Sequence, residues 1–224
     1  MFVCSCSQVV NSGYDLQPND RREQKRLNLQ SHICNLALGE ALYRAPIESE
    51  IQKILDLGTG TGALPPNSRL EIDDFEWEWD YPHPFDYIHM RDIEGSICDF
   101  TVGIFSDGDS AEKTISMQRW RGLLVEASKK CGRQFSMAQN YKQKFKVPFS
   151  PWPKDPKLKD LGSLQQANML EALDAYSLAL MNRFLGWTVE DVRVLPAKVR
   201  KELMDWKLHI YSRLYVVFGR RECA

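Results

Sequence analysis

The chain has 224 residues, of which 43% are hydrophobic and 26% charged, and its formal net charge is −1. These values fit one soluble globular domain, because the length suffices for a full hydrophobic core. A near-neutral charge without a clustered basic face argues against a nucleic-acid partner, and no run reaches the ~20 apolar residues of a membrane helix.

The first half of the chain predicts one long helix followed by short strands. Residues 19–42 repeat apolar side chains about every 3.6 positions, with charges on the opposite face and Asn19 or Asp20 as the N-cap. No element is predicted before residue 19. Strands are predicted for the runs KILDL (53–57), LEID (70–73) and FDYIHM (85–90).

The second half is mainly helical. Residues 114–130 carry apolar side chains at helical spacing and predict one helix. Ser163 and Gln166 form a capping box, which predicts a second helix that reaches about Leu185 and ends at Gly186.

A third helix is predicted to begin at the capping box of Thr188 and Asp191 and to reach about Trp206. Pro196 lies inside it. Because proline lacks an amide donor and clashes with the preceding turn, we expect the helix to be kinked or split there.

Three further segments complete the chain order. The run KQKFK (142–146) is expected to be a solvated surface segment, and PFSPWPKDP (148–156) to be irregular because prolines fix φ. Residues 210–218, IYSRLYVVF, predict a late strand. This order of elements is typical of an α/β domain with a helical insertion or cap.

The run DLGTGTG follows a predicted strand with glycines at three alternate positions, Gly58, Gly60 and Gly62. Glycine permits positive φ and close approach of the backbone to a ligand. Ligands of open parallel sheets lie outside the carboxyl ends of the strands, which is where this loop is expected. Asp56, two positions before the first glycine, favours S-adenosylmethionine (SAM) over a dinucleotide; a glycine turn without a ligand is the alternative.

Two further features bear on the choice of cofactor. Gly58, Gly60 and Ala63 formally satisfy the dinucleotide pattern GxGxxA, which keeps NAD as an alternative, although Pro65 and Pro66 oppose the helix that this pattern should open. The later run LEIDD places two carboxylates at a strand end, where they can accept hydrogen bonds from an adenine amino group or ribose hydroxyls. The alternative for these acids is a solvated turn.

Taken in order, many segments of the chain resemble the fungal LaeA-like SAM-dependent methyltransferases, a family associated with secondary metabolism. The resemblance covers most of the sequence and rests on NDRREQKRLNLQSH, ALYRAPI, ILDLGTGTG, LEIDDFEWEW, FDYIHMR, GSICDF, QRWRGLLVEASKKCGRQF, PFSPWPKDPKLKDLG, LALMNRFLGWTVEDVRVLPAKVRKEL and HIYSRLYVVFGR. It implies a class I methyltransferase fold with a Rossmann-like sheet, a SAM pocket and a helical substrate lid between Leu158 and Trp206.

The resemblance also implies roles for particular residues. The acid before the glycine loop and the loop itself would hold the methionine part of SAM, and the two later acids would lie near the adenine. An arginine after the fourth strand would lie beside the sulfonium, and a tyrosine near the N-terminus would close over the cofactor. These residues are Tyr14, Asp56, Gly58, Thr59, Gly60, Gly62, Asp73, Asp74 and Arg91.

Methyl transfer requires mainly alignment of donor and acceptor, and a base only for a poorly acidic hydroxyl or amine. His89 and His209 are the candidate bases on residue type, and Tyr211 is a weaker one. A structural histidine is the alternative for both.

The chain departs from the family pattern at three places. Between the glycine loop and LEIDD the family has a helix, a second strand ending in a ribose-binding acid and another connection, whereas residues 63–69 are too few for them. A helix and a strand are likewise expected to be missing after Phe100, and again where only KQKFK precedes PFSPWPKDP. The implied organisation is therefore one shortened domain (1–224) with an N-terminal helical segment (1–50), a reduced SAM-binding core (51–105), a helical lid (106–208) and a terminal strand (209–224).

Two functions follow from these observations. The first is a SAM-dependent methyltransferase acting on a small-molecule metabolite. The second is a non-methylating member of the same fold, either a cyclase-like catalyst or a metabolite-binding pseudoenzyme, which would form a homodimer to cover exposed sheet edges.

Cysteine usage and the first residues bear on metal binding and location. The six cysteines form no CxxC pair at metal-ligand spacing, so no metal site is predicted. The first ten residues lack a basic region followed by a sustained apolar stretch, so we expect no signal peptide. Free thiols fit the cytoplasm, with the nucleus as the alternative.

Overall fold

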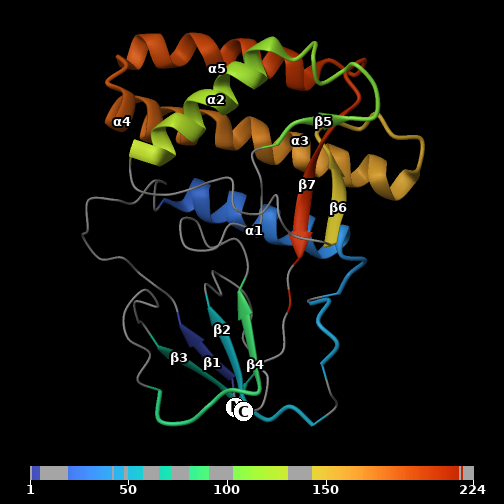
Figure 1. Ribbon diagram of the computed structural model, residues 1–224, viewed down its shortest axis with the longest axis vertical. Helices are drawn as coiled ribbons and strands as arrows, with labels where there is room; N and C mark the ends of the chain where they lie inside the picture. The colour runs from blue at the N-terminus through green and yellow to red at the C-terminus, as the bar shows by residue number, and fades with distance from the viewer. Residues whose placement is uncertain are drawn as a thin grey trace.

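A computed structural model describes residues 2–5, 20–41, 43–47, 50–57, 66–71, 81–90, 103–130, 143–216 and 218. These residues form a mixed α/β structure. A parallel sheet lies at one end, and a body of helices with a small antiparallel sheet lies at the other (Figure 1).

The parallel sheet has four short strands in the order β3-β1-β2-β4. All neighbouring pairs are parallel, so the four carboxyl ends lie at one edge. In Figure 1 the strand arrows point from the bottom of the molecule toward α1 and the other helices. The strands are β1 (Phe2–Ser5), β2 (Ile54–Leu57), β3 (Ser68–Glu71) and β4 (Tyr87–Met90).

The strand β1 corrects the sequence analysis, which predicted no element before residue 19. It lies between β2 and β3, with Val3 opposite Leu55 on one side and Arg69 on the other. Strands β2 and β3 do not pair with each other, so β1 is the strand that joins them into one sheet. A run of four residues has too little periodicity to identify a strand from sequence.

The connection from β2 to β3 has only the ten residues 58–67. An extended chain of that length spans at most ~33–36 Å. To reach the start of β3, the chain has to cross two interstrand spacings, ~10 Å, and go back along the length of a four-residue strand, ~13 Å. Ten extended residues are therefore long enough for this connection. Strands β2 and β3 are thus ten residues apart in sequence, and residues 2–5 supply the strand that lies between them in the sheet.

Alternation along β2 explains why it is buried in this sheet. Leu55 and Leu57 are fully buried and pack against Tyr81, Phe85 and Met90, whereas the intervening residues are half-buried. Such alternation places one face of the strand in an apolar core and the other face against a more polar environment.

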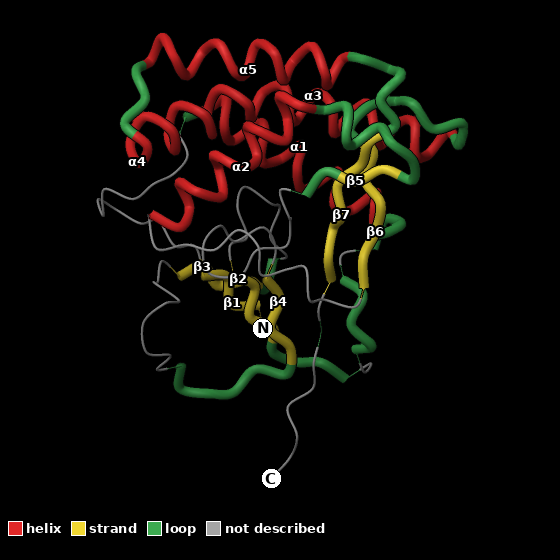
Figure 2. The backbone as a smooth tube through the Cα atoms, turned by 45° about the horizontal axis from the view of Figure 1, so that its top comes forward, coloured by secondary structure: helices red, strands yellow, loops and turns green. Residues whose placement is uncertain are grey.

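The helical body contains the larger hydrophobic core. Figure 2 shows its helices gathered on one side of the parallel sheet. Its elements are α1 (Arg21–Ala37), α2 (Ile115–Lys130), α3 (Pro156–Ser177), the π-helix η2 (Leu178–Asn182), α4 (Arg183–Leu185) and α5 (Val189–Met204). Fully or nearly fully buried core residues come from α2, α3, η2 and α5, and include Met117, Leu173, Leu180, Met181, Val192, Val199 and Leu203.

Several predicted helix ends are confirmed. The Asp20 side chain accepts a hydrogen bond from the Glu23 amide at the start of α1, and Thr188 accepts one from the Asp191 amide at the start of α5. Gly186 ends α4 with φ of 71°, a left-handed conformation in which glycine has no steric penalty.

One predicted helix start is wrong. The helix expected from Ser163 begins at Pro156, because Asp155 caps it and proline is favoured in the first turn. Ser163 instead donates a hydrogen bond to the Lys159 carbonyl within α3. At Pro196, where a kink or a split was expected, the helix is not split, since α5 is one helix from Val189 to Met204.

Gly162 explains how α3 approaches the segment before it. A Cβ atom at this position would lie 2.3 Å from the carbonyl oxygen of Ser150. The side chain of any other residue would therefore push α3 away from the chain that enters it. This contact fixes the start of the proposed lid region against the antiparallel sheet.

The antiparallel sheet has the order β5-β7-β6, with β5 (Phe105–Ser106), β6 (Gln143–Pro148) and β7 (Ile210–Val216). The predicted terminal strand is thus confirmed as β7. The lysine-rich run is exposed, as expected for a solvated surface segment, since Lys144 and Lys146 face solvent. It also forms most of β6, which pairs with β7 and buries Val147, so a strand precedes the proline-rich segment.

Candidate functional site

The predicted site residues follow strands that end at one edge of the parallel sheet. The glycine loop follows β2, Asp73 and Asp74 come shortly after β3, and Arg91 follows β4. Parallel pairing therefore directs all three segments to the same edge. The residues themselves, Gly58 to Gly62, Asp73, Asp74 and Arg91, lie outside the described part of the chain, as does Tyr14.

The strands that follow β2 in the chain lie on opposite sides of it in the sheet. It leaves β2 toward β3 on one side of the sheet and then returns to β4 on the other side. Connections that diverge from adjacent parallel strands open a crevice at the carboxyl ends, where ligands of α/β proteins bind. The expected binding place is therefore the carboxyl edge of β2 and β4.

Asp56 and His89 occupy this edge as direct partners in the β2–β4 register. His89 Nδ1 lies 2.8 Å from Asp56 Oδ1, and about a quarter of each side chain is exposed (24% and 25%). From sequence, these residues were expected to have separate roles, Asp56 in cofactor binding and His89 as a candidate base. Their pairing could not be foreseen, because it depends on the register of two strands, and the two residues are 33 positions apart in sequence.

Aromatic rings continue the same face of the sheet. The Tyr87 ring lies 6.2 Å from that of His89, and the Tyr43 ring lies 5.7 Å from that of Tyr87. Residues two apart on a strand share a face, so Tyr87 and His89 lie on the side of β4 that carries the Asp56 pair. The site thus combines a carboxylate, an imidazole and two phenol rings. On the opposite face, β2 and β4 carry the apolar pairs Leu55–Ile88 and Leu57–Met90.

The other candidate bases lie in the helical body. His209 is exposed, and its ring stacks on Trp152 at 4.8 Å. It precedes β7, which begins beside the helices and runs toward the parallel sheet (Figure 1). Tyr211 is buried, and its hydroxyl donates to Asp107. The structure therefore brings only His89 of the three candidates to the edge of the parallel sheet.

A buried polar network between α1 and α3 was not foreseen. Arg26 pairs with Glu23 at 2.7 Å, and both side chains are more than nine-tenths buried. Asn168 of α3 accepts a hydrogen bond from Arg26 and donates one to Gln30. The network holds α1, which lies between the other helices and the parallel sheet, against α3 (Figure 1).

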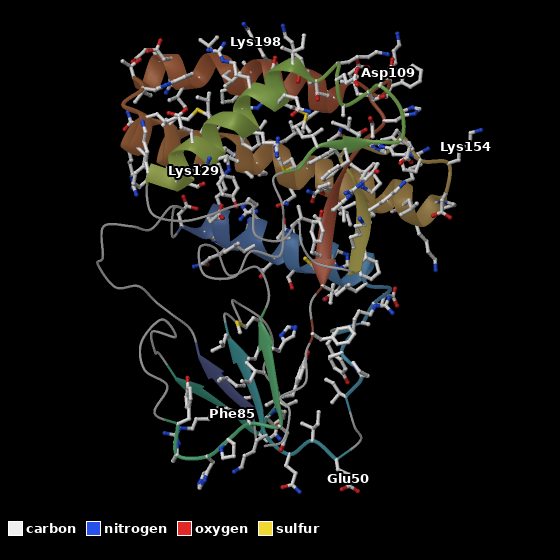
Figure 3. All side chains as sticks on the ribbon, viewed as in Figure 1. Glu50, Phe85, Asp109, Lys129, Lys154 and Lys198 are labelled. Carbon is white, nitrogen blue, oxygen red and sulfur yellow. The ribbon has the colours of Figure 1, made fainter. Side chains whose placement is uncertain are left out.

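A groove of about 580 Å³ lies between α2 and α5. Its lining residues are Ile115, Ser116, Arg119, Gly186, Trp187, Asp191, Val194, Leu195 and Lys198. Figure 3 shows Lys198 at the end of the molecule opposite Phe85, which packs in the parallel sheet. The groove is therefore separate from the Asp56–His89 site.

The described residues were compared with the patterns of metal sites and of membrane-spanning helices, and neither is found among them. Among them, no group of three or more histidines, cysteines or acids is placed to hold a metal ion. Within the same described ranges, no helix is long and apolar enough to cross a membrane.

Comparison with known proteins identifies relatives along most of the chain. Methyltransferase pytC of Aspergillus terreus is 30% identical over 267 aligned positions, covering 91% of this chain and 82% of the relative. Probable methyltransferase tdiE of Emericella nidulans is 26% identical, covering 100% of this chain and 90% of the relative. The secondary metabolism regulator LAE1 of Cochliobolus heterostrophus is 23% identical, covering 93% and 90%.

The lengths of these alignments support internal shortening. The aligned spans of 267 and 285 positions exceed the 224 residues of the chain, so the relatives contain internal segments that this chain lacks. No protein-family model matches the chain, and no solved structure matches it.

Proposed function

The chain belongs to the LaeA-like family of fungal methyltransferases, and on that premise we propose that it binds SAM and methylates a small-molecule metabolite. The observation that carries the proposal is the parallel edge at which β2, β3 and β4 end. The glycine-rich loop follows β2 and the acidic segment follows β3 in the sequence, which supports a cofactor site at this edge.

The proposed fold is class I and Rossmann-like. Parallel strands with a glycine loop after the central strand β2 support it, as does the divergence of the chain toward β3 and β4. In this chain β1 takes the place next to β2 that the shortened connection leaves open. The proposed cofactor site is thereby built on an interior strand with neighbours on both sides.

The chemistry of the edge fits SAM. Backbone amides of a glycine loop can approach the methionine carboxylate closely, and carboxylates can accept from adenine and ribose donors. SAM supplies an activated methyl group, so the protein mainly has to align donor and acceptor. The residues proposed to hold it are Tyr14, Gly58, Thr59, Gly60, Gly62, Asp73, Asp74 and Arg91.

Isothermal titration calorimetry of the full chain with SAM tests the proposal. We expect binding heat from the wild type and its loss in Gly60→Val, because a branched side chain would block the loop. Gly108→Ala is the matched control, since an added Cβ there meets no atom within 4 Å. Absence of heat at millimolar SAM from a protein with native circular dichroism would refute SAM binding.

Internal shortening favours a second candidate, a non-methylating member that binds a metabolite or promotes a cyclisation as a homodimer. Failure to bind SAM together with a dimeric mass in light scattering would support it. A monomeric mass would contradict its dimer, and measured methyl transfer would exclude it. NAD serves as the second titrant, because heat from NAD alone would indicate the dehydrogenase alternative.

A further inference from the structure

We infer that Asp56 is a positioning residue for His89, and that His89 Nε2 accepts the proton of a hydroxyl- or amine-bearing acceptor. The inference rests on the proposed methyltransferase function and names the acceptor class of the same site. It changes the role expected for Asp56, which the sequence analysis assigned to the methionine part of SAM.

Strand pairing fixes the geometry of the Asp56–His89 pair. Asp56 and His89 are register partners on neighbouring parallel strands, so the backbone of the sheet fixes their separation. His89 Nδ1 lies 2.8 Å from Asp56 Oδ1, and because an ionised carboxylate can only accept, a hydrogen bond between them requires Nδ1 to carry the proton. A neutral imidazole carries one N–H, so binding Nδ1–H to a carboxylate leaves the lone pair on Nε2.

The Asp56–His89 pair lies near the carboxyl ends of β2 and β4. Asp56 is two residues before the glycine loop, and His89 is two residues before Arg91. Both therefore lie at the carboxyl edge of β2 and β4, where the chain diverges. About a quarter of each side chain is exposed, and the Tyr87 ring centroid lies 6.2 Å from that of the His89 ring.

A purely stabilising role explains this arrangement poorly. Partly exposed ion pairs contribute little to stability, typically ~0–1 kcal/mol. A carboxylate that holds one nitrogen of an imidazole is, however, a recurrent means of orienting a general base and of stabilising the imidazolium that forms. The position at the proposed binding edge therefore favours a role in proton transfer.

The proposed step is balanced in atoms and charge. The oxygen or nitrogen of the acceptor forms a bond to the methyl carbon, while the carbon–sulfur bond breaks and its electron pair stays on sulfur. His89 Nε2 takes the proton that the acceptor loses, and the adjacent Asp56 carboxylate stabilises the imidazolium. An acceptor that is already ionised at neutral pH, such as a carboxylate, would need no such base, so we infer an acceptor with a weakly acidic hydroxyl or an amine.

The tautomer of His89 tests the positioning step without any need for turnover. In the full chain with ¹⁵N-labelled histidine, ring-nitrogen NMR reports which nitrogen carries the proton, and His89→Gln assigns the signal among the four histidines. We expect Nδ1–H in the wild type and a shift toward Nε2–H in Asp56→Ala. Asp109→Ala is the control, because Asp109 pairs with Lys113 in the helical body. An Nε2–H tautomer in the wild type would overturn the inference.

SAM calorimetry separates the roles of the two residues. If Asp56 positions His89, Asp56→Ala and His89→Gln both keep the SAM dissociation constant within about threefold of the wild type. A tenfold or greater weakening in Asp56→Ala alone would identify Asp56 as a direct SAM ligand and overturn the inference. Absence of heat from the wild type would instead refute the proposed function, while the tautomer would still report on the pair.

The acceptor class is tested with phenol and aniline as probe acceptors and methyl-labelled SAM. We expect His89→Gln to slow label transfer by ~10²–10⁴-fold, the usual contribution of a general base, with SAM affinity retained. Added imidazole should partly restore transfer in His89→Ala. Equal rates in His89→Gln and wild type, or transfer to neither probe by a wild type that binds SAM, would contradict the inferred acceptor class.

Discussion

At the scale of single residues, Asp86 connects the two strands that carry the proposed site. Its carboxylate accepts hydrogen bonds from the amides of Gln52 and Lys53 at 2.9 and 2.8 Å, just before β2 begins. The Lys53 amide, followed by that of Gln52, lowers the pKa of Asp86 below its ordinary value. A charged Asp86 therefore holds the start of β4 against the start of β2.

The lowered pKa determines the sign of the pH dependence. A carboxylate with a lower pKa in the folded state stabilises the fold above its unfolded pKa, and this contribution is lost as the pH falls through the folded pKa. We expect Asp86→Ala to lower the urea midpoint slightly at pH 7, with the difference from wild type disappearing in acid. Asp160→Ala, which removes an exposed acid of α3, is the control. An undiminished difference in acid would show that the charge of Asp86 is not the cause.

At the scale of elements, β1 is the strand on which the continuity of the parallel sheet depends. Val3 is paired with Leu55 and Arg69, so its backbone lies in the interior of the sheet. Proline in an interior strand removes a ladder donor. We expect Val3→Pro to speed hydrogen exchange of residues 54–57 at least severalfold, while α3 and α5 are unaffected. Val3→Ile keeps a β-branched side chain and is the control; unchanged exchange of β2 in Val3→Pro would contradict the pairing of β1.

The helices differ in how much of their structure could be predicted from the sequence. The helix starts at Asp20 and Thr188 were predictable because their side chains cap the first turn locally. The face that α1 buries was not, since Glu23 and Arg26 are buried as a pair while Leu27 is 37% exposed. A polar side chain can be buried when it has hydrogen-bond partners in the fold. One partner of Arg26 is Asn168, which is 142 positions away in sequence, so the burial of Arg26 could not be predicted locally.

The proposed site also has parts that could be predicted from the sequence and parts that could not. The glycine loop and the acids were recognisable because each motif is local in sequence. The contact between Asp56 and His89 was not, because strand register decides it. The N-terminal strand was likewise hidden, because its four residues become a strand only through neighbours far along the chain.

At the scale of the whole molecule, the two parts of the structure have cores of different size. Among the described residues, the main core of the helical body contains 14 buried residues, including Leu173 and Leu180. The core of the parallel sheet contains two, Leu55 and Leu57. Because local stability follows buried apolar contacts, the sheet that carries the proposed site is expected to open before the helical body.

Hydrogen exchange at increasing urea concentrations tests this order. We expect amides of β2 and β4 to exchange through an opening of lower free energy than amides of α3 and α5. A ligand that binds only the closed sheet should raise that free energy by RT ln(1 + [L]/Kd), or about 2.7 kcal/mol at a hundredfold excess of SAM over its dissociation constant. The helices should gain less than the sheet if they open separately. A single free energy for all four elements, with or without SAM, would show instead that sheet and helices unfold as one unit, and that the helical body is part of the binding-competent state.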